Sequence, residues 1–158
     1  GLVTILPHKG VLISEVNALK QLRLMEFRQV SEQLMVRCAA IRSTREQKKA
    51  FLELADKLDQ AGSENDDRNF MRYDNELHLT VAQAANNEYL YRAMEIYNSL
   101  SRRFWYMHNK ESFDLPYCAA LHADLVRQIA TGNPEKAVAA HDKLVNYILE
   151  VLRASLAL

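Results

Sequence analysis

Glycine and proline are scarce in this sequence: its 158 residues include four glycines and three prolines. A β-sandwich or β-barrel needs many tight turns, so these counts favour long helices. Long apolar runs are missing too, since no stretch reaches the roughly 18 residues that a membrane-spanning helix needs. The N-terminus lacks the charged head and apolar run of a signal peptide. We therefore expect a cytoplasmic protein with no membrane partner.

Cysteine and net charge are also nearly absent. Cys38 and Cys118 are far apart and form no C-x-x-C pair, which argues against a zinc knuckle or a redox motif. The 20 Lys and Arg residues balance the 20 Asp and Glu residues, so bulk electrostatics do not make the chain a nucleic-acid binder. Hydrophobic residues at 49% and charged residues at 25% are typical of one ordinary globular domain.

The first 13 residues differ in character from the rest. β-Branched residues flank Pro7-His-Lys-Gly10, a pattern that predicts two short strands around a turn. Two strands alone are marginally stable in water. We therefore interpret residues 1–13 as the remnant of a larger upstream structure, and residues 14–158 as the main domain.

Helical periodicity, capping residues and helix breakers predict six helices in that main domain. They are expected at about 14–43, 44–62, 67–85, 88–108, 116–131 and 134–157. Ser14 and Asn133 are predicted caps, Gly62 a predicted stop, Ser63 a candidate cap, and Pro116 a first-turn residue. Short connections between six helices predict an all-α antiparallel bundle, preceded by the short β-hairpin.

A few ionisable residues could meet inside such a bundle. Asp74 and His78 are spaced i, i+4 and therefore share one helix face. His122 and His141 lie in the fifth and sixth predicted helices. Helical proteins build metal sites from a carboxylate and imidazoles that converge in this way. The alternative is that these are surface or capping residues, with His122 a core-edge histidine bonded to a carbonyl.

Several short motifs resemble one family of regulators. Asp74-Asn-Glu-Leu-His78 followed by Ala84-Ala-Asn-Asn87 is similar to its "D-x-x-F-H … a-x-x-N" signature, and Arg28-Gln-Val-Ser-Glu32 to its first-helix "R-x-x-x-E". His122-Ala-Asp-Leu-Val and the later Ala130-Thr-Gly-Asn-Pro-Glu-Lys-Ala137 match its third block. The sequence thus resembles the C-terminal ligand-binding (FCD) domain of GntR-type transcription regulators, FadR subfamily.

The resemblance implies a dimeric helical bundle that binds a small carboxylate effector. Many members hold a divalent metal, such as zinc or nickel, through one Asp and three His. Asp74, His78 and His122 match three of these ligands, but Leu144 occupies the fourth position, where leucine cannot bind a metal. His141 lies three residues earlier, about 4.5 Å along the helix axis, and is the candidate substitute. We expect the metal to be weakly bound or absent, with His78 and His122 then bonding a carboxylate directly.

The expected function is an effector-sensing and dimerisation domain rather than an enzyme. Operator DNA would be bound through an upstream winged helix-turn-helix domain, with residues 1–13 as its wing. Arg28 is either a carboxylate anchor or the partner of Glu32 in an ion pair, and Arg103 is a weaker effector-binding candidate. Asn87 is expected to cap a helix. The alternatives are a metal-dependent hydrolase-like enzyme and a pure dimerisation module with a degenerate pocket.

Overall fold

The computed structural model describes residues 2–15, 17–108 and 113–156. These residues form a two-stranded antiparallel sheet followed by six helices, which confirms the predicted fold class. The elements are β1 (Val3–Leu6), β2 (Gly10–Ile13), α1 (Ala18–Arg42), α2 (Arg45–Ser63), α3 (Asp67–Ala84), α4 (Glu88–His108), α5 (Leu115–Ala130) and α6 (Pro134–Leu156).

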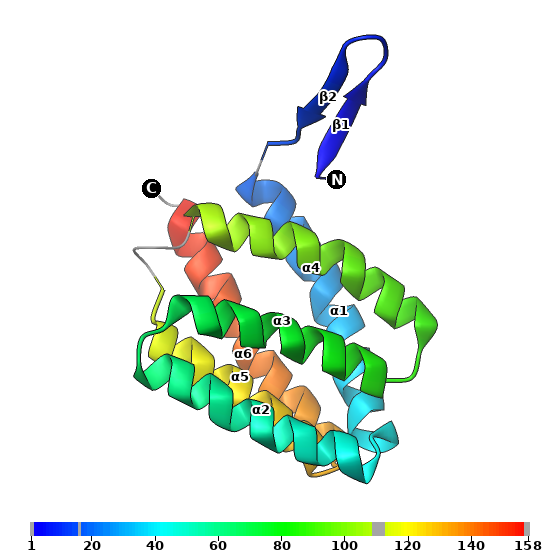
Figure 1. The fold of residues 1–158 in the computed structure, drawn as a ribbon, viewed down its shortest axis with the longest axis vertical. Coiled ribbons are helices and arrows are strands. Elements are labelled where there is room, and N and C mark those ends of the chain that lie inside the picture. The colour runs from blue at the N-terminus through cyan, green and yellow to red at the C-terminus, as the bar shows by residue number, and fades with distance from the viewer. Residues whose placement is uncertain (1, 16, 109–112, 157–158) are drawn as a thin grey trace.

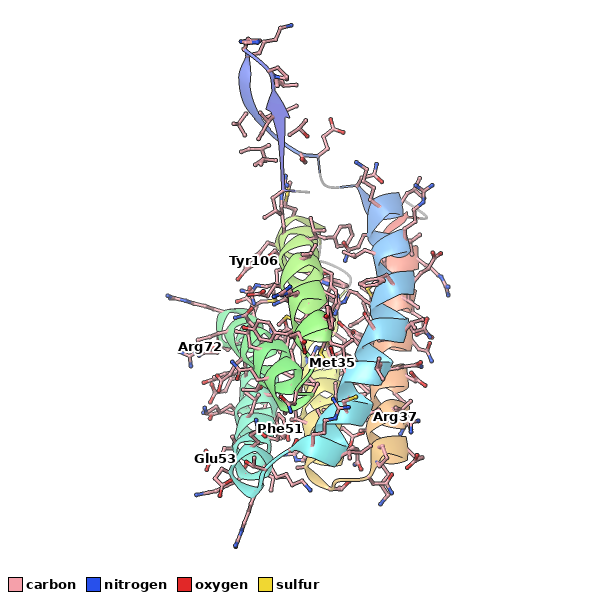
Figure 2. The ribbon with its side chains drawn as sticks, turned by 90° about the vertical axis from the view of Figure 1, so that its right-hand side faces the viewer. Met35, Arg37, Phe51, Glu53, Arg72 and Tyr106 are labelled. Atoms are coloured by element: carbon pink, nitrogen blue, oxygen red, sulfur yellow. The ribbon has the colours of Figure 1, made fainter. Side chains whose placement is uncertain are left out.

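The helices lie in two layers, with α2, α3 and α4 on one side and α1 and α6 on the other (Figure 1). α5 packs along both α2 and α6, and so joins the layers. Figure 2 shows Met35 of α1 pointing between the layers, whereas Arg37 lies on the outside, where it pairs with Glu135 of α6 at 3.1 Å. None of the helices in the described part of the chain is long and apolar enough to cross a membrane.

The hairpin projects away from the bundle (Figure 1). Val3 pairs with Ile13 and Leu6 with Gly10, and every residue of both strands is exposed. The turn requires positive φ at His8 (59°) and at Gly10 (115°), and glycine adopts such a conformation most readily. The predicted hairpin is therefore present, and its fully exposed strands place it outside the core of the bundle.

The predicted start of α1 is wrong, and the predicted end of α2 is one residue early. Ser14 does not cap α1; its N–H donates to Leu2 O at 3.0 Å, which extends the hairpin, and Asn17 caps the helix instead. Gly62 does not stop α2 but lies within it. A Cβ at Gly62 would come 2.7 Å from Cβ of Ala119, so this glycine permits the close approach of α5.

The remaining caps follow simple local rules. Asp66, rather than Ser63, caps α3, because its side chain accepts from Asn69 N. Asn87 and Asn133 cap α4 and α6 as predicted, since their side chains accept from Leu90 N and Lys136 N. Pro116 lies in the first turn of α5 as predicted. The predicted end of the last helix at 157 falls outside the described residues.

Candidate effector-binding site

A cavity of about 570 Å³ lies inside the bundle. Its lining comes from α1, α3, α4, α5 and α6 and from the residues just before α3 and α5. This volume is typical of pockets for small molecules. Arg28, His78, His122, His141 and Leu144 are among the lining residues, so the structure gathers most of the predicted site residues around one space.

Asp74, His78 and His122 form the first polar cluster on the cavity wall. The i, i+4 spacing on α3 brings Nε2 of His78 to 3.4 Å from Oδ1 of Asp74. α5 carries His122, whose Nε2 lies 3.2 Å from the same carboxylate oxygen. Two imidazoles from different helices thus converge on one carboxylate, as the sequence predicted.

The hydrogen bonds of His122 define its protonation. Its Nδ1 lies 2.8 Å from the carbonyl oxygen of Cys118, which can only accept, so Nδ1 carries a proton. Burial by itself lowers the pKa of His122, but the adjacent Cys118 and the bond to Asp74 raise it well above its usual range. Burial raises the pKa of Asp74, but His78 and His122 outweigh it and hold that pKa well below the usual range. The contact between His122 and Asp74 therefore favours the charged forms of both groups.

Arg28, Glu32 and His141 form a second polar cluster. Nε of Arg28 donates to Oε1 of Glu32 at 2.9 Å, so the ion-pair interpretation of Arg28 is present in the structure. Nε2 of His141 lies 3.2 Å from Oε2 of Glu32. Nη1 of Arg28 donates to Oγ of Ser101 at 2.9 Å, and Gln21 donates to the same oxygen at 3.2 Å.

The donor set for a metal ion is incomplete in this cavity. Among the described residues, no group of three His, Cys, Asp or Glu side chains is arranged to hold one. Leu144 lines the cavity with an apolar side chain. The two ring nitrogens of His141 lie within 3.3 Å of the carboxylates of Glu32 and Asp142, so the candidate substitute ligand is already engaged. No step of the function proposed below therefore passes through a metal.

Arg103 does not belong to the described lining of the cavity, in contrast to its predicted role. Its guanidinium bonds the carbonyl oxygens of Leu2, at 3.2 Å, and Ser14, at the base of the hairpin. Arg102 lines the cavity instead and donates to Met71 O at 2.7 Å. Adjacent helical residues point in directions about 100° apart, and of these two arginines it is Arg102 that lines the cavity.

Among the lining residues of α4 that sequence reasoning missed are Ser101 and Trp105. A lone serine in a helix carries no recognisable signal, and its importance lies in partners 73 and 80 residues away in the chain. Trp105 belongs to an aromatic run, Phe104-Trp-Tyr106, in which Phe104 is buried and Tyr106 is exposed. Helical periodicity could have placed Trp105 between these two environments.

The family model of the FCD domain matches residues 23–146, which is most of the chain. The chain belongs to the FCD domain family. The matched range includes every residue of both polar clusters. The predicted FCD domain of a GntR-type regulator is thereby confirmed, whereas the FadR subfamily stays a prediction.

The fold of this FCD domain is similar to that of the E. coli protein McbR/YncC. The match covers 97% of this chain and 77% of that chain, with a TM-score of 0.77 and a sequence identity of 16%. An identity this low shows a shared fold alone. No protein with a curated function matches the sequence.

Proposed function

We propose that this FCD domain senses a small organic acid in the central cavity and acts as a regulatory domain rather than as an enzyme. The observation that carries the proposal is a cavity of about 570 Å³ whose polar groups come from five helices of the bundle. A ligand changes the affinity of a second site only when it binds one conformational state of the protein more tightly than the other. A ligand that bridges several helices meets that condition, because it fixes their relative positions.

Donors for a carboxylate are available on the polar wall. Arg28 uses two of its five N–H groups in the bonds to Glu32 and Ser101, which leaves others for a ligand. Ser101 accepts both of its hydrogen bonds from nitrogen donors, so its own hydroxyl proton remains to be donated. His78 lines the cavity with a side chain that is 13% exposed. These groups together would orient the acidic end of the effector.

We further propose that the acid contacts His78 directly, without a tightly held metal. The apolar Leu144 and the engaged ring of His141 support this. His122 was also predicted to contact the acid, but its two ring nitrogens already lie against Cys118 O and Asp74. Elemental analysis of the protein, purified without chelator or histidine tag, should find well under one zinc or nickel ion per chain. One tightly held metal per chain would overturn this part of the proposal.

Signal transfer to DNA would run through the hairpin side of the molecule. We propose that residues 1–13 belong to the wing of a winged helix-turn-helix domain that binds operator DNA. The exposed apolar residues of both strands support this, since they need another surface to cover them. Arg103 ties the base of this hairpin to α4, whose neighbouring Ser101 and Arg102 line the cavity.

We propose that the domain forms a homodimer. Phe27, Val30, Leu34 and Ile41 on α1 are 48–70% exposed and recur at helical spacing, so they share one face. A two-fold symmetric partner would cover such an apolar stripe. Light scattering should give twice the chain mass at micromolar concentration, and Val30→Glu should yield monomers. A wild-type monomer at that concentration would contradict the dimer.

Calorimetric titration with a panel of organic acids tests the central proposal. At least one acid should bind with one site per chain, and Ser101→Ala should weaken it by about tenfold through the loss of one hydrogen bond to a charged group. Ser99→Ala is the matched control, because Ser99 is exposed on the same helix and bonds only Glu95 O among the contacts of described residues. If no acid binds, or if both variants behave alike, the proposed site is wrong.

A further inference from the structure

The cavity wall carries both polar and apolar groups. The two polar clusters line the same cavity, and together they are called the polar patch. Most other lining residues carry aliphatic or aromatic side chains. A short, highly charged ligand would not require so large an apolar part of the cavity lining.

Apolar side chains from several elements line the cavity. Leu144 and Ile148 lie one turn apart on α6 and face the cavity together. The ring of Phe113 lies 6.0 Å from that of Phe70 on α3 and 5.8 Å from that of Trp105 on α4. A ligand that left these surfaces in contact with water would forgo most of the free energy that the site offers.

The two carboxylates of the polar patch already face basic side chains. Glu32 pairs with Arg28 at 2.9 Å, and Asp74 lies 3.2 Å from His122. Two further arginines line the cavity, an exposed Arg68 and a half-buried Arg102 that donates to Met71 O. A second or third carboxylate on a ligand that reaches neither arginine would be buried without its own cation, which is costly. One carboxylate can be satisfied by the hydrogen bonds of the patch.

We propose that the effector is a monocarboxylic acid with an extended apolar body, rather than a short di- or tricarboxylate. This inference rests on the proposed function, because it assumes an acid in this cavity. The carboxylate contacts the patch around Arg28, Ser101 and His78. The apolar body lies against Leu144, Ile148 and the aromatic cluster.

A homologous series of acids tests the inference on the unmodified chain. Butanoate, hexanoate and octanoate should bind with increasing affinity, by about fourfold for each methylene that the cavity buries. Octanedioate has the same length and a second carboxylate, and octan-1-ol has none; both should bind at least tenfold more weakly than octanoate. Trp105 is the one tryptophan of the chain and lines the cavity, so its emission reports binding, with calorimetry for stoichiometry.

The outcomes separate this inference from the proposed function. Saturable binding of octanoate, at one per chain and tighter than succinate or citrate, supports both. Tighter binding of succinate or citrate overturns the inference and leaves an acid-binding domain. If none of these acids binds, or if octanoate binds without saturation, both are overturned.

A substitution in the apolar wall gives a second, independent measurement. Leu144→Asn should weaken octanoate binding by about tenfold and leave butanoate nearly unchanged, so that affinity no longer rises with chain length. Leu52→Asn is the control, because Leu52 is 49% exposed on α2 and is not part of the described lining. If Leu144→Asn does not fold, the unmodified series above still decides the question. An unchanged chain-length dependence in a folded Leu144→Asn variant would contradict the inference.

Discussion

At the scale of residues, buried charges in this domain occur as compensated sets. Glu32 is 5% exposed and serves two partners, Arg28 on its own helix and His141 on α6. Breaking a buried ion pair by removing one partner costs about 3–5 kcal/mol, because the remaining charge is left uncompensated. The same network therefore shapes the polar wall of the cavity and joins α1 to α6.

Glu32→Gln should lower the free energy of unfolding at neutral pH by about 3 kcal/mol or more. Burial raises the pKa of Glu32, but the Arg28 charge and the His141 hydrogen bond outweigh it, and the pKa falls below its ordinary value of 4.5. A depressed pKa gives stability that is present above the unfolded-state pKa and lost as the pH falls towards the folded-state value. The variant should therefore lose less stability than the wild type between about pH 5 and pH 3.

Urea unfolding at a series of pH values measures both effects. Glu53→Gln is the control, because Glu53 is exposed on α2 and its ion pair with Lys49 is long, at 3.7 Å (Figure 2). This control should stay within about 0.5 kcal/mol of the wild type. Asp74 also has a depressed pKa, so some acid dependence should remain in the Glu32 variant. Equal acid dependence in variant and wild type would contradict the role of Glu32.

Leu144→His should create or strengthen binding of zinc or nickel. Asp74, His78 and His122 present three nitrogen and oxygen donors on the cavity wall, and the variant adds a fourth from α6. Elemental analysis after dialysis should rise towards one ion per chain. Leu52→His adds an imidazole outside the cavity and should not bind the metal. If Leu144→His gains nothing, the four side chains do not converge.

At the scale of elements, side-chain caps define where most helices begin. Thr44 and Gln47 form a reciprocal capping box: Gln47 N donates to Thr44 Oγ1 at 3.2 Å, and Thr44 N donates to Gln47 Oε1 at 2.9 Å. These bonds satisfy two backbone groups that the helix itself leaves unpaired. The short segment between α1 and α2 is thereby held in one conformation.

Thr44→Ala should destabilise the domain by about 1 kcal/mol, because it removes the acceptor for Gln47 N. For a domain of this size the melting temperature should fall by about 2–4 °C. Thr44→Ser keeps the hydroxyl and should stay close to the wild type. Thermal unfolding followed by circular dichroism compares the three proteins. Equal melting temperatures for the alanine and serine variants would show that the cap contributes nothing.

At the scale of the whole molecule, the hairpin and the bundle differ in how they are held. The bundle has a common buried core, whereas all residues of both strands are exposed. Arg103 provides the hydrogen bonds between the hairpin base and α4. The hairpin should therefore open more easily than the helices, with Arg103 limiting its motion.

Amide hydrogen exchange should be fast in β1 and β2 and slow in the buried helices. Arg103→Ala should further speed the exchange of the Ser14 amide, which donates to Leu2 O beside the arginine contacts. Arg92→Ala is the control, because Arg92 is exposed on the same helix. Strong protection of the strands in the wild type would instead make the hairpin an integral part of the bundle.

The six helices, the hairpin and the family were all predictable from local patterns in the sequence. Caps such as Asn87 and Asn133 act over two or three residues, so a local pattern is enough to identify them. The i, i+4 pairs Asp74 with His78 and Arg28 with Glu32 follow from helix geometry for the same reason. The motifs around these residues were also sufficient to identify the FCD domain.

How these local segments meet depends on packing between residues that are far apart in the chain. Ser101 receives Gln21 from 80 residues away, and Glu32 meets His141 from 109 residues away. Which of Arg102 and Arg103 faces the cavity depends on the rotation of α4 about its axis. The lack of a side chain at Gly62 is explained only by the close approach of Ala119. Backbone propensities act over a few residues, whereas a cavity is formed by side-chain packing between distant segments. Its charge balance is therefore not visible in any local pattern.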